Sequence, residues 1–237
     1  MAVILENKPI EGGFFLMRLP FAARCLPGQF VMLRIPGVLD PFLGRPISVF
    51  DWEDGVLSLL YQVVGKGTRL FSTLQPGQTV EAQGPYGNGF PVLNQDYTLI
   101  GGGVGIAPLY LLAKAHRQAY PDRKVELHLG FREQPVLEQA YRAVCHRCTI
   151  DIGGFVTDTV DFSLPGRIYC ACGPTPMMRA AATLAQAHNA TLYVSLEERM
   201  ACGVGACLGC TCQTASGNKR ACKDGPVFLA QEVFPHA

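Results

Sequence analysis

The pattern of apolar and polar residues changes near residue 94. Before this point the apolar runs are short and are separated by Gly, Pro and Asp. Runs of this kind predict antiparallel strands, and strands this closely spaced predict a small barrel. The predicted strands span 12–20, 29–36, 45–53, 55–65 and 78–87, with a short helix at 68–77.

After residue 94, buried strands alternate with helical segments. This alternation predicts a parallel sheet with helices on both faces. The strands span 97–103, 124–131, 167–173 and 191–197, and the helices span 105–120, 135–145 and 174–189. From residue 199 onward the chain is rich in Cys and Gly and has no apolar period, so something other than a hydrophobic core must hold its shape. We therefore expect three domains, 1–93, 94–198 and 199–237.

The composition is that of a folded protein and argues against two classes of partner. Hydrophobic residues make up 49% of the 237 positions and charged residues 16%, with a net charge of +1. No long basic run is present, so neither nucleic acid nor an anionic membrane is expected as the main partner. The apolar uncharged run 97–113 is shorter than the roughly 20 residues that span a bilayer.

The cysteine content indicates the compartment. Ten cysteines occur in a chain whose N-terminus does not resemble a secretory signal, because Glu6 interrupts the apolar start. Clustered thiols in such a protein hold metal or do redox chemistry more often than they form disulfides. We therefore expect a cytoplasmic protein.

Four cysteines are spaced as cluster ligands. Cys202, Cys207 and Cys210 have the spacing C-x4-C-x2-C, and Cys222 follows after eleven residues. This spacing is typical of plant-type [2Fe–2S] centres. Structural zinc sites usually have two C-x2-C-like pairs, which the four-residue gap fits poorly. Zinc, disulfides and free thiols remain alternatives on spacing alone, and the spacing favours the iron–sulfur cluster.

The glycines of this segment have a physical reason to be there. Gly203, Gly205 and Gly209 lie between the cysteines, where a loop that wraps a cluster needs positive φ and close approach of its N–H groups to sulfur. A fifth thiol of the segment, Cys212, is interpreted as a buried packing residue. Elsewhere, Cys145 and Cys148 form a lone C-x2-C without enough further ligands for a second metal site.

Two segments of the first ninety residues suggest an anion site. In "GRPISVF", Arg45 precedes the proline that opens a strand. Taken alone, such an arginine is usually just exposed, but its fork of donors also suits a pyrophosphate, with Ser48 facing a flavin ring. In "YQVVGKGTRLF", a turn at Gly67 opens a helix near Thr68. A helix N-terminus with free N–H groups is a second anion-binding feature.

A glycine-rich turn follows the first strand of the predicted parallel sheet. In "LIGGGVGIAPLYLL", Gly101, Gly103 and Gly105 match G-x-G-x-G rather than the usual Rossmann fingerprint. The glycines still allow a dinucleotide to lie against the backbone, although a plain strand-to-helix turn is the alternative. In "CACGPTPMM", Cys172 and Gly173 are expected at the same carboxyl edge of the sheet.

The order of these motifs resembles a known family. RPxS, G-x-G-T, GGGxGxxP and CGPxPM, in that order, are similar to the ferredoxin-reductase superfamily. "SLEERMACGVGACLGC" followed by "RACKDGPVF" resembles the electron-transfer subunits of type B dihydroorotate dehydrogenases. The resemblance spans nearly the whole chain, and the cysteine motif is its most specific part. It implies an FAD-binding barrel over 1–93, an NAD-binding α/β domain over 94–198 and a [2Fe–2S] lobe over 199–237.

The resemblance also implies binding residues for each cofactor. Those for FAD are Arg45, Pro46, Ile47 and Ser48, then Gln62, Val63 and Val64, and then Gly67 and Thr68. Those for NAD are Gly101, Gly102, Gly103 and Gly105, followed by Cys172, Gly173 and Pro174. The cluster ligands are Cys202, Cys207, Cys210 and Cys222. Three thiols that the family does not lead us to expect, Cys145, Cys148 and Cys170, lie at no cofactor position.

The implied function is electron transfer in pyrimidine biosynthesis. Hydride chemistry moves two electrons and a [2Fe–2S] centre takes one, so a flavin must stand between them. The implied partner is an FMN-containing catalytic subunit that oxidises dihydroorotate, in a heterotetramer with two copies of each chain, with the electrons passing to NAD. Arg132 could take the 2′-phosphate of NADP, but the adjacent Glu133 opposes it, which favours NAD. This chain offers no catalytic residues for a pyrimidine.

Two other functions remain open from the sequence. One is a diaphorase subunit of a ferredoxin:NADP or sulfide-linked reductase, which shares the barrel and the cluster lobe. A relative with Asp in place of one cluster cysteine would point there, whereas this chain has all four cysteines. The other is a binding module with structural zinc and no redox activity.

Overall fold

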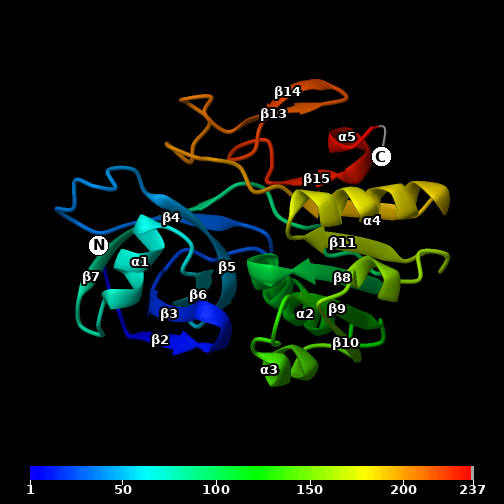
Figure 1. Ribbon diagram of the computed structural model, residues 1–237, viewed down its shortest axis with the longest axis horizontal. Helices are drawn as coiled ribbons and strands as arrows, with labels where there is room; N and C mark the ends of the chain where they lie inside the picture. Colours follow the sequence, from blue (N-terminus) through cyan, green and yellow to red (C-terminus); the bar gives the residue numbers. More distant parts are fainter. Residues whose placement is uncertain (236–237) are drawn as a thin grey trace.

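Seven short antiparallel strands form the first sheet of the computed structural model, which describes residues 1–235 (Figure 1). The strand order is β1-β7-β4-β5-β6-β3-β2. The strands are β1 (Ala2–Val3), β2 (Glu6–Ile10), β3 (Phe14–Pro20), β4 (Phe30–Arg34), β5 (Arg45–Glu53), β6 (Val56–Gln62) and β7 (Thr79–Tyr86).

The edge strands of this sheet, β1 and β2, follow each other in the chain, and the residues between them bond to both sides of the sheet, so the sheet closes into a barrel. The N–H of Ile4 donates to the carbonyl of Gln78 and the N–H of Leu5 to that of Arg18, both at 2.8 Å. The N-terminal segment therefore joins β7 to β3. Apolar side chains of the strands fill the interior, and helix α1 (Lys66–Thr73) packs beside it through the buried Phe71. The predicted antiparallel barrel is confirmed.

The second sheet has six strands in the order β10-β9-β8-β11-β12-β15, of which the first five are parallel. Tyr97 and Leu99 of β8 belong to one core and Ile100 to another, so helices cover both faces as predicted. The strands are β8 (Tyr97–Gly102), β9 (Val125–Phe131), β10 (Arg147–Ile152), β11 (Ile168–Cys172), β12 (Thr191–Ser195) and β15 (Val227–Leu229). The helices are α2 (Ala107–Ala119), α3 (Glu138–Ala143) and α4 (Thr175–Ala187), with 3-10 turns at Gly103–Ile106 and Val156–Thr159. A further 3-10 turn, Glu11–Gly13, lies between β2 and β3 of the first sheet.

Helix α2 of the second sheet packs directly against strand β5 of the barrel. The rings of Tyr110 and Phe50 stack with centroids 4.3 Å apart. Beside them, Lys114 Nζ lies 2.9 Å from Asp51 Oδ2 and 3.3 Å from Glu53 Oε2. Burial alone would lower the pKa of Lys114, but the two carboxylates raise it above its usual value. An aromatic stack and an ion pair therefore hold the two sheets together.

The C-terminal segment combines loops with short regular elements. A hairpin of β13 (Thr211–Thr214) and β14 (Gly217–Arg220) follows the cysteine-rich loop, and α5 (Ala230–Val233) ends the described chain. Strand β15 joins the second sheet antiparallel to β12. The expected division at residue 199 stays a prediction, and this strand is one element that ties the third segment to the second. No helix within residues 1–235 is long and apolar enough to cross a membrane.

The two carboxylates around Lys114 should differ in their contribution to stability. Asp51 is mostly buried, so Asp51→Asn removes a charged partner from a poorly solvated lysine and should cost about 1–3 kcal/mol. Glu53 is 64% exposed, so the matched change Glu53→Gln should cost at most about 1 kcal/mol. Thermal unfolding of the two variants with cofactors bound should show the larger fall in Tm for Asp51→Asn. Equal falls would mean that the buried pair does not join the sheets.

Candidate functional site

The four predicted cluster ligands lie together as two pairs of thiols. Cys207 shifts the pKa of the Cys202 thiol, and Cys210 that of Cys222, with which it shares one apolar cluster. Within residues 1–235, no three His, Cys, Asp or Glu side chains converge on one metal position. A [2Fe–2S] cluster takes two protein thiolates on each of its two irons. Four thiols, three of which accept backbone N–H groups, fit the predicted [2Fe–2S] centre.

Backbone N–H groups are directed at the sulfur atoms. Gly205 N–H donates to Cys222 Sγ at 3.0 Å, Cys222 N–H to Cys210 Sγ at 3.4 Å and Gly209 N–H to Cys207 Sγ at 3.5 Å. N–H groups of Cys207 and Val204 lower the pKa of the Cys202 thiol to about 6. Such donors stabilise thiolates, which are the form that binds metal. Burial instead raises the pKa of Cys222 to about 12, so proton release from this thiol must accompany metal binding.

Two glycines of the loop meet steric limits that a side chain would violate. Gly203 has φ of 72° and Gly205 has φ of 79°. A Cβ on Gly203 would lie 2.8 Å from Met32 Cγ, and one on Gly205 would lie 2.9 Å from Lys223 Cβ. Gly209 differs, because a Cβ there would meet only Cys207 Sγ at an ordinary 3.5 Å. The loop thus depends on Gly203 and Gly205 for its shape.

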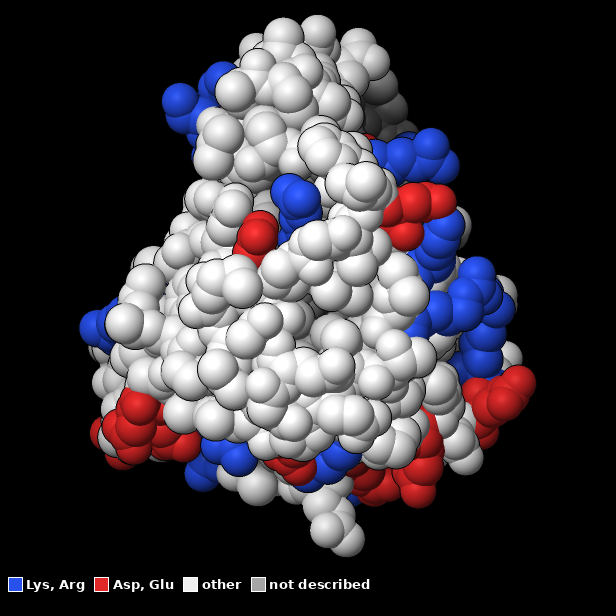
Figure 2. Space-filling model, turned by 90° about the vertical axis from the view of Figure 1, so that its left-hand side faces the viewer, with Lys and Arg blue, Asp and Glu red and all other residues white. Residues whose placement is uncertain are grey.

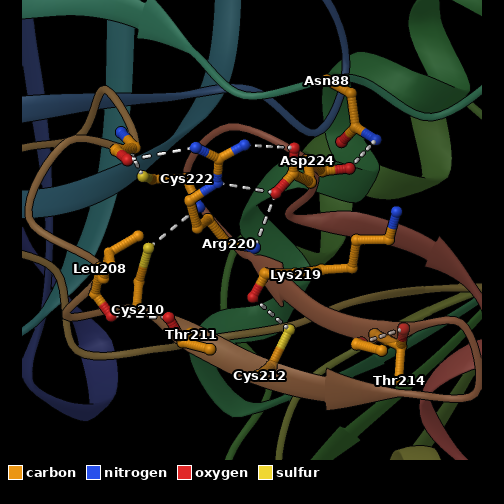
Figure 3. A network of polar contacts seen from close by, with 12 residues as sticks. Asn88, Leu208, Cys210, Thr211, Cys212, Thr214, Lys219, Arg220, Cys222 and Asp224 are labelled. Atoms are coloured by element: carbon orange, nitrogen blue, oxygen red, sulfur yellow. Dashed lines mark hydrogen bonds and ion pairs between the residues drawn. The ribbon is translucent and has the colours of Figure 1, made fainter.

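An ion pair that the sequence analysis missed clamps this loop (Figure 3). Arg220 Nε lies 2.9 Å from Asp224 Oδ2, and Arg220 Nη1 donates to the carbonyl of Gly205 at 3.3 Å. The Arg220 side chain lowers the pKa of Asp224 to about 2. Arg220 and Asp224 flank Cys222, so the clamp holds the distant fourth thiol against the loop of the other three. The i, i+4 spacing of opposite charges was the available signal.

The cysteine loop packs on the outside of barrel strand β4. Phe30 and Met32 of β4 form one apolar cluster with Cys210 and Cys222. In the register of the barrel, Phe30 pairs with Ser48 of β5 and Met32 with Pro46. Neighbouring strands lie about 5 Å apart. The thiols therefore lie one strand away from the segment that the sequence assigns to FAD.

The predicted pyrophosphate residues also come together. A Cβ on Gly67 would lie 2.8 Å from Arg45 Nε, so the Arg45 side chain lies across the first turn of α1. Arg45 Nη1 donates to the carbonyl of Leu43 at 3.0 Å. Thr68 Oγ1 accepts hydrogen bonds from the N–H groups of Val64 and Gly65, which orders the turn before α1. A guanidinium beside a helix N-terminus fits an anionic diphosphate.

The remaining predicted FAD residues lie on β5 and at the end of β6. Pro46 and Ser48 are half-buried on β5, whereas Ile47 points into the barrel core. Gln62 ends β6, where its Nε2 donates to the carbonyl of Gly12 at 3.4 Å, and the N–H of Val63 donates to Gly13 at 3.0 Å. Val64 is 77% exposed, so its side chain is available to a ligand.

Arg34 is a second arginine of this region that sequence reasoning missed. It lines the same small crevice as Arg45 and Gly67, and its guanidinium carbon lies 5.3 Å from the centroid of the Phe42 ring. Its Nε is buried and has no hydrogen-bond partner within residues 1–235. The sequence around Arg34 does not mark it as a binding residue, because a basic residue at a strand end is usually solvated.

The glycine-rich turn and the Cys-Gly-Pro segment meet at the carboxyl edge of the parallel sheet. Gly101 of β8 pairs with Cys172 of β11. A Cβ on Gly105 would lie 2.4 Å from the carbonyl oxygen of Cys172, and one on Gly102 would lie 2.7 Å from Met177 Sδ and 3.1 Å from Pro174 Cδ. The two turns therefore touch backbone to backbone.

Open space lies beside these two turns. Gly103 has φ of 56° and no atom near its Cβ position. Gly173 has φ of 154° and is buried against Gly102. This edge of an open sheet is where such folds bind dinucleotides.

Comparison with known proteins gives the family. The family model described as the iron-sulfur cluster binding domain of dihydroorotate dehydrogenase B matches residues 197–234. The electron transfer subunit of dihydroorotate dehydrogenase B (NAD(+)) from Clostridium acetobutylicum is 37% identical over 98% of this chain and 95% of its own length. The chain belongs to this family of electron transfer subunits.

Further relatives of the dihydroorotate dehydrogenase B electron transfer subunit family agree with this assignment. The Geobacillus kaustophilus electron transfer subunit is 41% identical over 87% of this chain and 86% of its own length. A solved NADH-dependent reduced ferredoxin-NADP oxidoreductase is 30% identical, with a TM-score of 0.88 over 98% of this chain and 89% of that chain. The family and the fold support the expected cofactors, an iron–sulfur cluster, FAD and NAD. The expected superfamily and the electron-transfer function are confirmed.

Gly205 and Gly209 of the cysteine loop provide a matched pair of substitutions within this family's cluster domain. Gly205→Ala places a Cβ against Lys223 at positive φ and displaces the N–H that bonds Cys222. Gly209→Ala meets neither obstacle. Iron per chain in the purified protein should fall to less than half in Gly205→Ala and stay near the parent value in Gly209→Ala. The loop geometry would be refuted by equal iron retention in both, with flavin content as the check on folding.

Proposed function

We propose that this chain passes electrons between NAD and the catalytic subunit of dihydroorotate dehydrogenase B, through FAD and a [2Fe–2S] cluster. One observation carries the proposal: the paired strands β4 and β5 lie between the cysteine loop and the second sheet. Strand β4 packs against the thiols Cys210 and Cys222. Phe50 of β5 stacks on α2, the helix that follows the glycine-rich turn. A flavin held along β5 would have the nucleotide on one side and the cluster on the other.

The protein's residues supply binding and order along this path. When bound, FAD exchanges two electrons with nicotinamide and single electrons with an iron–sulfur cluster. Arg45 and the first turn of α1 would hold the diphosphate of FAD, and the buried Nε of Arg34 supports the same role. Gly103 leaves room for the nucleotide at the sheet edge. The four cysteines would hold the cluster, and Arg220 fixes the loop that carries them.

The surface around the thiols supports transfer to a partner protein. Cys207 is exposed, and in the same loop Val204 is 50% and Leu208 61% exposed. Exposed apolar residues gathered on a loop are typical of interfaces. The barrel side of the molecule has few Lys, Arg, Asp or Glu side chains across its centre (Figure 2). We infer an FMN-containing catalytic subunit as the partner, in a cytoplasmic heterotetramer with two copies of each chain.

A diaphorase subunit of a ferredoxin-linked reductase is the second candidate. The TM-score of 0.88 to the NADH-dependent reduced ferredoxin-NADP oxidoreductase favours it on fold. The relatives of 35–41% identity are instead electron transfer subunits of dihydroorotate dehydrogenase B, and the matched cluster domain has the same description. The two candidates share FAD and the cluster, so the partner distinguishes them.

The order of the path predicts a split effect for a cluster ligand. Cys207→Ser should retain FAD and should still oxidise NADH with a dye that accepts electrons from flavin. Transfer to the catalytic subunit should fall at least 100-fold, because the electrons leave through the cluster. Steady-state rates with the dye and with the partner measure the two activities.

The matched control for this variant is Cys212→Ser. Cys212 lies in the same segment but is not one of the four predicted ligands, and it donates its thiol hydrogen to the carbonyl of Lys219 at 3.5 Å. This variant should keep both activities. If Cys207→Ser folds, binds FAD and yet loses the dye reaction, the cluster does not lie downstream of FAD.

The partner gives a further prediction. The isolated chain should oxidise NADH with dyes and should not oxidise dihydroorotate, because in the proposed complex the catalytic subunit binds the pyrimidine. Adding the FMN-containing catalytic subunit should give dihydroorotate-dependent reduction of NAD and a stable complex on size exclusion with light scattering. A catalytic subunit whose NAD-linked activity is the same without this chain would contradict the proposal, and activity with ferredoxin instead would favour the second candidate.

A further inference from the structure

Two thiols far from the cluster loop form a close pair of their own. Cys145 follows helix α3, and Cys148 is the second residue of strand β10. Cys148 packs against the apolar cluster that contains Cys145, and each thiol shifts the pKa of the other. Cys145 is buried and Cys148 is half-buried, so one thiol is sheltered while the other can meet a small reagent. Neither residue takes part in the proposed electron transfer from NAD to the partner.

A metal site does not explain this pair. The only further ligand type in the motif is His146, and its Nδ1 accepts a hydrogen bond from the N–H of Val125 at 3.0 Å. That bond turns the imidazole toward the start of β9. Within residues 1–235, no third His, Cys, Asp or Glu side chain converges with the two thiols on a metal position. The pair therefore has the chemistry of a dithiol.

The neighbouring Cys145 thiol and the charge of Arg142 favour a thiolate on Cys148. Arg142 Nη1 donates to the carbonyl of Cys148 at 3.2 Å, and Arg117 Nη1 donates to the carbonyl of Ala143 at 2.9 Å. The contact with Cys145 and the charge of Arg142 lower the pKa of Cys148, against burial and the carboxylate of Glu138. The contact with Cys148 and burial raise the pKa of Cys145. One reactive and one resolving thiol in contact are the arrangement of a redox-active dithiol.

We propose that Cys145 and Cys148 form a reversible disulfide when the protein meets hydrogen peroxide. The Cys148 sulfur attacks one peroxide oxygen, so that an S–O bond forms, the O–O bond breaks and one water leaves. The Cys145 sulfur then attacks Cys148, so that the S–S bond forms, the S–O bond breaks and a second water leaves. The two thiols lose two electrons and two protons in total, and one peroxide is reduced to two waters. A small dithiol such as dithiothreitol reverses the reaction.

The sequence allows a direct peptide test on the cofactor-loaded protein. Trypsin cleaves after Arg142, Arg147 and Arg167, which places Cys145 in peptide 143–147 and Cys148 in peptide 148–167. After peroxide treatment, alkylation with iodoacetamide and digestion without reductant, the two peptides should appear joined and two hydrogens lighter than their sum. Dithiothreitol should separate them. Iron content measured in parallel restricts the test to peroxide levels that leave the cluster intact.

The expected result is the joined pair at peroxide levels that spare iron. Two alkylated peptides under those conditions, or Cys148 oxidised to sulfinic acid without a link, would overturn the proposal. Cys145→Ser should lose the link and leave a sulfenic acid on Cys148 that dimedone traps. Cys25→Ser is the matched control, because Cys25 is buried in the barrel core and burial raises its pKa to about 12. It should leave the link unchanged, and the parent protein alone decides the question if a variant does not fold.

Discussion

The pairing of β4 with β5 is the interaction on which the rest of the structure depends. This register places Met32 opposite Pro46 and Phe30 opposite Ser48. The outer side chains of β4 pack against two cluster thiols, while the other end of β5 packs against α2 of the second sheet. A slip of one residue would turn Phe30 and Met32 into the barrel and remove the support of the cysteine loop. In the proposed arrangement, one strand pair thus sets the spacing of the three cofactor sites.

The cysteine loop is held in place differently from the two sheets, because little apolar core lies beneath it. Its supports are the small cluster around Phe30 and Met32, the Arg220–Asp224 pair and backbone N–H groups directed at sulfur. Gly203 and Gly205 adopt positive φ against neighbours that leave no room for a Cβ. In such a lobe, ligand binding contributes directly to the folded state. The same loop exposes Leu208, which connects the geometry that holds a cluster with the surface that can reach a partner.

Features determined by local backbone chemistry could be predicted from the sequence, and those determined by distant contacts could not. The thiol spacing, the glycine turn after β8 and the alternation of strands and helices are local, and they led to the correct fold and family. Strand β2 has the polar sequence ENKPI and is a strand only because β3 is beside it. The short β15 likewise depends on β12. Arg34 is distinguished by a buried nitrogen that has no hydrogen-bond partner among residues 1–235, which no sequence pattern reveals.

The central claim is that one chain carries both a flavin and a two-iron cluster, joined through β4 and β5. Iron, acid-labile sulfide, zinc and released flavin should be measured per chain in protein purified without oxygen. The account predicts about two irons, about two sulfides and about one FAD, with the visible absorbance of both groups. About one zinc per chain without iron or sulfide would contradict it.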